Sequence, residues 1–137
     1  MSIVALVALG AGIFAALGTL HLLYTFFTPK FDPRDAAVKD AMQATSPRIT
    51  RATTMWKAWV GFNASHSLGA MVFGAVYLTL AVQHPEVLAA SKPLLLIAGA
   101  TGLAFLALAV RYWFRIPLIG IALATLCFLV ASARAFI

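Results

Sequence analysis

Residues 3–27 read I-V-A-L-V-A-L-G-A-G-I-F-A-A-L-G-T-L-H-L-L-Y-T-F-F, a run without a single charged side chain. An α-helix rises about 1.5 Å per residue, so about 20 apolar residues cross the hydrocarbon core of a bilayer. No basic residue precedes this run, and it is longer than the apolar region of a typical signal peptide. It therefore predicts a retained transmembrane helix.

The rest of the chain has the same apolar character. Hydrophobic residues make up 63% of the 137 residues and charged residues 10%, against about 25% charged residues in an average soluble domain. So few charges cannot cover the surface of a small soluble protein. The composition indicates an integral membrane protein and excludes a soluble domain, a disordered chain and a disulfide-stapled module, since Cys127 is the only cysteine.

Three further segments reach spanning length, at about residues 55–82, 93–114 and 116–136. Four strands cannot close a barrel in lipid, so helices must satisfy the backbone polar groups. The predicted fold is an all-α, four-helix transmembrane bundle, in which residues 1–137 form a single transmembrane domain.

The polar segment 28–54 contains the signals of a short helix. Asp32 is a suitable N-cap, and Pro33 suits the first helical position. Apolar and small residues then recur at helical spacing, at Val38, Ala41, Met42 and Thr45. This pattern predicts a short amphipathic helix lying at the membrane interface.

A second cap-and-proline signal, Ser46-Pro47, ends the same segment. It predicts that the second spanning helix begins near Pro47, well before its apolar part. Arg48 and Arg51 would then stand on a helical extension outside the hydrocarbon.

The cations are divided unequally between the two sides of the predicted bundle. Eight of ten fall on the side of segment 28–54 and of the third-to-fourth turn: Lys30, Arg34, Lys39, Arg48, Arg51, Lys57, Arg111 and Arg115. Lys92 and Arg134 fall on the other. The positive-inside rule places both connections in the cytoplasm and both termini outside. The formal charge of +6 is thereby explained by orientation, and we expect no nucleic-acid partner.

The second span carries two stripes at helical spacing. One stripe is mixed aromatic and polar: Trp56, Trp59, Asn63, His66, Ser67, Ala70, Phe73, Gly74 and Tyr77. The other is a small-residue ridge for close helix packing: Gly61, Ser65 and Gly69.

Polar residues of the first and second spans occur at similar depths. His21 lies six residues before Phe27 and Asn63 lies seven residues after Trp56, and His66 is about one turn deeper. We expect a ligand-binding cluster in the cytoplasmic half, with aromatic walls: His21, Tyr24, Asn63, His66 and Ser67, with Trp56 and Trp59. The alternative interpretation is interhelical hydrogen bonding alone.

Several chemistries remain open for the two histidines. They could bind a lipid, a quinone or another small molecule, provide axial ligands to haem, or take part in a copper site. No span contains Asp or Glu, so no catalytic residue is assigned and enzyme activity stays undecided. Arg111 and Arg115, with Lys57 and Arg51, either anchor the bundle or capture an anionic headgroup.

Three segments carry a family resemblance. They are M-W-K-A-W-V-G-F-N-A-S-H-S-L-G at residues 55–69, H-L-L-Y-T-F at 21–26 and R-Y-W-F at 111–114. Together they resemble a family of small, uncharacterised bacterial four-helix integral membrane proteins, most specifically in G-F-N-x-S-H-S-x-G. The resemblance implies the fold and the bacterial inner membrane, and it transfers no catalytic residue.

Two functions are therefore expected to compete. The first is binding of a small molecule or lipid through the polar cluster. The second is an accessory subunit of a larger membrane complex, in which the small-residue ridge packs against another subunit or a second copy. A membrane-embedded enzyme or haem-binding protein is a third hypothesis.

Overall fold

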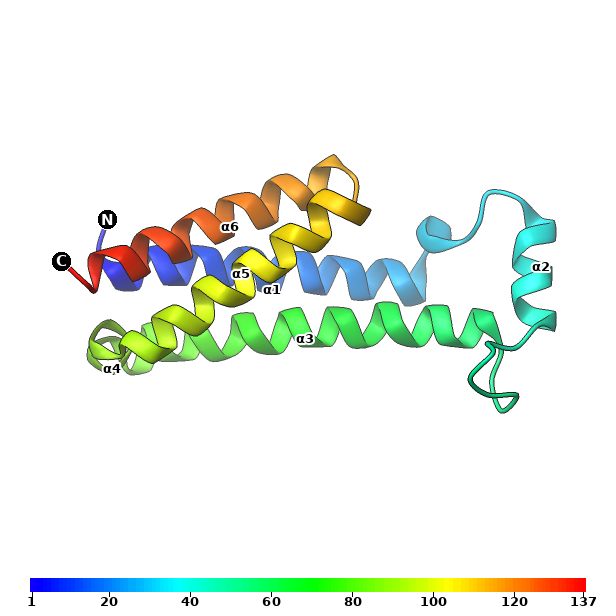
Figure 1. Cartoon of the computed structure of the whole chain (residues 1–137), viewed down its shortest axis with the longest axis horizontal. Helices are drawn as coiled ribbons and strands as arrows, with labels where there is room; N and C mark the ends of the chain where they lie inside the picture. Colours follow the sequence, from blue (N-terminus) through cyan, green and yellow to red (C-terminus); the bar gives the residue numbers. More distant parts are fainter. The chain divides into compact units, whose positions relative to one another are not determined.

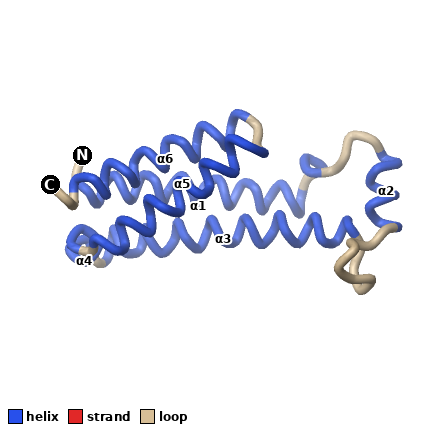
Figure 2. The backbone as a smooth tube through the Cα atoms, viewed as in Figure 1, coloured by secondary structure: helices blue, strands red, loops and turns tan.

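The computed structural model describes all 137 residues, Met1–Ile137, and contains only helices and loops (Figures 1 and 2). The long helices are α1 (Ile3–Phe27), α3 (Met55–Gln83), α5 (Lys92–Tyr112) and α6 (Arg115–Arg134). All four are long and apolar enough to cross a membrane. The predicted all-α class is confirmed, and the four spans end within two residues of their expected bounds.

Short helical elements fill the connections. Between α1 and α3 lie a 3-10 turn, η1 (Pro29–Phe31), and α2 (Ala36–Ala44). Between α3 and α5 lies α4 (Pro85–Ala90), a helix that was not predicted from the sequence. Pro85 occupies its first turn and Leu88 is fully buried, so one apolar anchor stabilises a helix too short for periodicity to reveal.

The start of α2 differs from its prediction. The N-cap is Asp35, whose carboxylate accepts a hydrogen bond from the backbone nitrogen of Ala37 at 2.9 Å. Asp32 instead ends η1 and pairs with Lys39 at 2.8 Å. The predicted cap at Asp32 was wrong because Thr28 and Pro29 start the 3-10 turn first.

The predicted extension of the second span toward Pro47 was also wrong. Helix α3 begins at Met55, and residues 45–54 form a loop. Thr54 supplies the first-turn acceptor, since its hydroxyl oxygen accepts from the Lys57 nitrogen at 3.3 Å. Hydroxyl side chains that bond nearby backbone compete with helix, and Thr50 does so with the Ala52 nitrogen at 3.1 Å.

The chain divides into two compact units, to each of which α1 and α3 contribute. We call Met1–Leu17 with Ala70–Ile137 the core unit, and Gly18–Gly69 the polar unit. The chain termini lie close together in the core unit (Figure 1), where the Arg134 guanidinium donates to the Met1 carbonyl.

One phenylalanine from each long helix meets at the centre of the core unit. The fully buried ring of Phe14 in α1 lies 5.0 Å from Phe73 in α3, 5.1 Å from Phe105 in α5 and 5.8 Å from Phe128 in α6. Tilted and edge-on contacts of this kind are the favourable arrangements for aromatic pairs. The phenylalanine cluster thus joins all four long helices.

Close helix approach in the core unit depends on Gly74. A Cβ atom added there would lie 2.7 Å from the Ala11 carbonyl oxygen and 2.8 Å from the Ala15 nitrogen. Since only glycine permits this backbone contact, α1 and α3 can approach closely at this residue. Two polar side chains add cross-links between helices: the Tyr77 hydroxyl donates to the Leu94 carbonyl at 2.6 Å and Ser132 to that of Leu95 at 2.8 Å.

Candidate functional site

The polar unit brings three of the predicted site residues into contact. His21 in α1 and Asn63 in α3 form a hydrogen bond of 2.9 Å between Nε2 and Oδ1. The ring of His66, one turn further along α3, meets that of His21 edge to face, with centroids 5.4 Å apart. All three side chains are partly exposed. The predicted meeting of His21 with Asn63 is therefore confirmed.

Backbone carbonyls fix the orientation of this cluster. The Asn63 amide nitrogen donates to the Trp59 carbonyl at 2.8 Å, which turns its oxygen toward His21. A carbonyl oxygen only accepts, so Nε2 of His21 carries the hydrogen and, in the neutral ring, Nδ1 keeps a lone pair. Ser67 and Thr25 donate within their own helices, each at 2.8 Å, to the carbonyls of Asn63 and His21.

Phe31, which was not among the predicted site residues, belongs to the same cluster. Its ring lies 4.4 Å from that of His21, and its carbonyl accepts from the Trp59 indole nitrogen at 3.1 Å. The turn that places Phe31 is capped by Thr28, with Pro29 at its first position. The dipeptide Thr28-Pro29 is a recognisable turn signal in the sequence. Helical periodicity, however, cannot predict that a residue of a three-residue turn packs against His21 of the preceding helix.

The remaining predicted wall residues make contacts with lysines. The ammonium of Lys30 lies 3.8 Å from the ring centre of Tyr24, and that of Lys39 lies 4.7 Å from Trp56. Lys39 also pairs with Asp32. Ser67 is fully buried, and its hydroxyl is used within α3. The cluster proper therefore consists of His21, Asn63, His66, Phe31 and Trp59.

The small-residue ridge, Gly61, Ser65 and Gly69, lies on an exposed face of α3. All three residues are exposed, and a Cβ atom at Gly61 or Gly69 would meet no atom within 4 Å. The close helix contact within the chain uses Gly74 instead. The role of the ridge in packing stays a prediction, which would require another chain.

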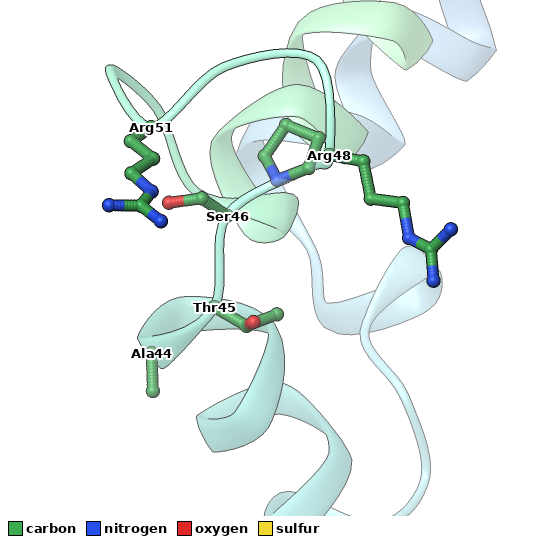
Figure 3. Close-up of a pocket in the computed structure, with 6 residues that line it drawn as sticks. Ala44, Thr45, Ser46, Arg48 and Arg51 are labelled. Atoms are coloured by element: carbon green, nitrogen blue, oxygen red, sulfur yellow. The ribbon is translucent and has the colours of Figure 1, made fainter.

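The basic candidates are exposed, and Arg51 borders the same hollow as Arg48, from the opposite side of the loop, rather than lying with Lys57. A hollow of about 520 Å³ lies in the loop after α2, lined by Ala44, Thr45, Ser46, Pro47, Arg48 and Arg51 (Figure 3). Lys57 does not line it. Arg111 and Arg115 belong to the core unit, where Arg111 lies 5.8 Å over the ring of Tyr112.

The geometry of the histidines does not fit haem. A bis-histidine haem needs two imidazoles on opposite faces of one macrocycle. The rings of His21 and His66 touch edge to face, and Nε2 of His21 is bonded to Asn63. Nor does any group of three or more His, Cys, Asp or Glu side chains come together to hold a metal ion. Cys127 is half-buried against the apolar core of the core unit.

No protein-family model matches the chain, and no curated protein or solved structure is significantly similar to it.

Proposed function

We propose that this protein is a bacterial inner-membrane protein that binds a lipid or another small amphipathic molecule through His21, Asn63 and His66. The observation that carries the proposal is the paired, partly exposed state of these three side chains. Polar groups within an apolar span are costly and tend to face a partner or a functional cavity. A purely structural pair would be expected to be closed off by its own helices.

The chemistry of the cluster favours a head group that accepts and donates hydrogen bonds. Two imidazoles offer both donors and acceptors, while Phe31 and Trp59 supply apolar surface beside them. No carboxylate occurs in any span, so a cationic ligand would find no counter-charge between the spanning helices. A quinone ring or the carbonyl of an acyl lipid has matching groups.

The proposed orientation follows from the cations. The connection between α1 and α3 and the turn between α5 and α6 lie in the cytoplasm, and both termini lie outside. The interfacial aromatics Trp56, Trp59 and Trp113 stand near the cytoplasmic ends of their spans, as aromatic belts do. Helix α2, which has no buried residue, lies along the membrane surface.

Native mass spectrometry of the protein, extracted gently from its host membrane, tests the binding proposal. We expect a bound small mass that is lost from His66→Ala and His21→Ala. The matched control is Ser65→Ala, which removes an exposed polar group one residue from His66 and should keep the ligand. If His66→Ala only lowers the unfolding temperature and the wild type carries no ligand, the cluster is structural.

A second candidate function, an accessory subunit, is favoured by the open ridge of Gly61, Ser65 and Gly69. Small residues let helix backbones approach closely, and a glycine face unused within the chain is available to a partner. Gly61→Leu or Gly69→Leu should release the chain from a larger complex on a native gel. Unchanged migration would argue against this function.

A further inference from the structure

The loop between α2 and α3 is a closed structure that presents a site of its own. Its two ends are joined because the Met55 nitrogen donates to the Thr45 carbonyl at 2.9 Å. A turn lies inside it, where the Thr50 nitrogen donates to the Pro47 carbonyl at 3.2 Å. The loop thus holds its residues in a defined arrangement at the foot of α3.

The chemical content of this loop matches an oxyanion. Residues 45–54 contain two arginines, five hydroxyl side chains and no acidic residue. Neither Arg48 nor Arg51 makes an ion pair, since the one ion pair of the chain joins Lys39 to Asp32. Both guanidinium groups are therefore available to phosphate, which they bind in bidentate fashion.

The hollow described above gives the oxyanion a place. Arg51 and the Ser46 hydroxyl point toward each other on one side of the loop, while Arg48 extends on the other side (Figure 3). The carbonyl end of α2, at Ala44 and Thr45, also borders the hollow. The partial negative charge at this helix end is about half an elementary charge. Because each guanidinium carries a full positive charge, the hollow remains positive overall.

Ile49 indicates that the oxyanion belongs to a lipid. It lies between the two arginines, and its side chain is 91% exposed. Transfer of an isoleucine side chain from water into an apolar phase lowers its free energy. The loop leads directly into α3, whose first turn carries Trp56, so the membrane interface is within its reach.

We propose that the loop at residues 45–54 binds phosphates of anionic phospholipid headgroups, one at Arg51 and Ser46 on one side and another at Arg48 on the other, while Ile49 inserts among the acyl chains. This site is separate in its residues from the histidine cluster. It goes beyond the proposed function, because it governs how the protein is held by its surrounding lipid rather than what the cluster binds.

The test uses the full chain in detergent, with native mass spectrometry after addition of phosphatidylglycerol or phosphatidylcholine. Phosphatidylglycerol should bind more tightly, and Arg51→Gln should weaken its binding about fivefold, the effect of one cationic residue near an anionic surface. The matched control is Arg34→Gln, which removes an equal charge from an exposed arginine of the same polar segment. It should change binding little.

Two further measurements identify the source of the phosphate. Ile49→Ser should weaken phosphatidylglycerol binding, and sn-glycerol 3-phosphate should bind the wild type far more weakly than the lipid does. Three results would overturn the proposal: unchanged lipid affinity in Arg51→Gln, an equal loss in Arg34→Gln, or glycerol phosphate binding as tight as the lipid and indifferent to Ile49→Ser. The last would indicate a soluble phosphate ligand.

Discussion

Helices α1 and α3 make different kinds of contact in the two units to which they contribute. In the core unit, Phe14 and Phe73 meet within the phenylalanine cluster and Gly74 lets the backbones touch. In the polar unit, His21 and Asn63 meet through one hydrogen bond, with both side chains partly exposed. One part of each helix is therefore closely packed and the other carries partly exposed polar side chains, to which the proposed function assigns recognition.

The physical basis of this division is the weak driving force for helix association in lipid. Lipid tails are as apolar as leucine, so packing and interhelical hydrogen bonds must hold the helices. The core unit uses packing almost alone, and Ser132 and Tyr77 add hydrogen bonds to carbonyls. A region already held in this way allows polar side chains elsewhere to remain partly open.

The largest effect is expected from Phe14→Ala, which empties the centre of the phenylalanine cluster. Truncation of a fully buried phenylalanine costs about 3–5 kcal/mol, and here it removes contacts with three other helices. Thermal unfolding in detergent, followed by circular dichroism, measures the loss. The control is Phe62→Ala in the polar unit, because Phe62 is 74% exposed. Equal losses in the two variants would contradict the division into units of different role.

A somewhat smaller effect is expected from Gly74→Ala. The added methyl group would overlap the backbone of α1 at Ala11 and Ala15, and overpacking typically costs about 1–3 kcal/mol. Gly12→Ala is the matched control, because a Cβ atom there meets nothing within 4 Å. The same thermal measurement should show a lower unfolding temperature for Gly74→Ala only. Equal stability of both variants would mean that α1 and α3 are not in close contact at Gly74.

The smallest effect on stability is expected from Asn63→Ala, which tests the polar unit in the same way as Phe14→Ala tests the core unit. Interhelical hydrogen bonds in membrane proteins contribute about 0.6 kcal/mol on average, so the unfolding temperature should fall only slightly. Ligand occupancy in native mass spectrometry should fall much more, since His21 loses the acceptor that orients its ring. A large loss of stability with unchanged occupancy would assign Asn63 to structure.

The sequence could predict the contacts that follow from depth along a helix. His21 and Asn63 stand at similar distances from the ends of their spans, and antiparallel helices bring equal depths together, so counting residues was sufficient. It was not sufficient for the loop between α1 and α3. There, local hydroxyl and proline contacts decide the helix starts: Thr28 with Pro29 starts the 3-10 turn, and Thr54 supplies an acceptor in the first turn of α3.

Helix faces were harder to predict than helix positions. Helix α3 carries the mixed aromatic and polar stripe, which includes Gly74, and the small-residue ridge, and the close contact within the chain is at Gly74 rather than on the ridge. Spacing alone treats such patterns alike. Which of them faces a neighbour depends on how α3 is rotated about its axis, and that rotation is fixed by side chains of other helices, such as Phe14 and Ala15.

The sequence by itself determined that this protein has four apolar helices long enough to span a membrane. The physical reason is that lipid offers the backbone no hydrogen-bond partners, so a long uncharged segment must satisfy its N–H and C=O groups within its own helix. Only the tertiary structure decided that Phe31 covers His21, that Gly74 is the close contact and that Arg48 and Arg51 stand on a closed loop. These features depend on contacts between segments distant in the sequence or on local competition for hydrogen bonds, which no period along the chain records.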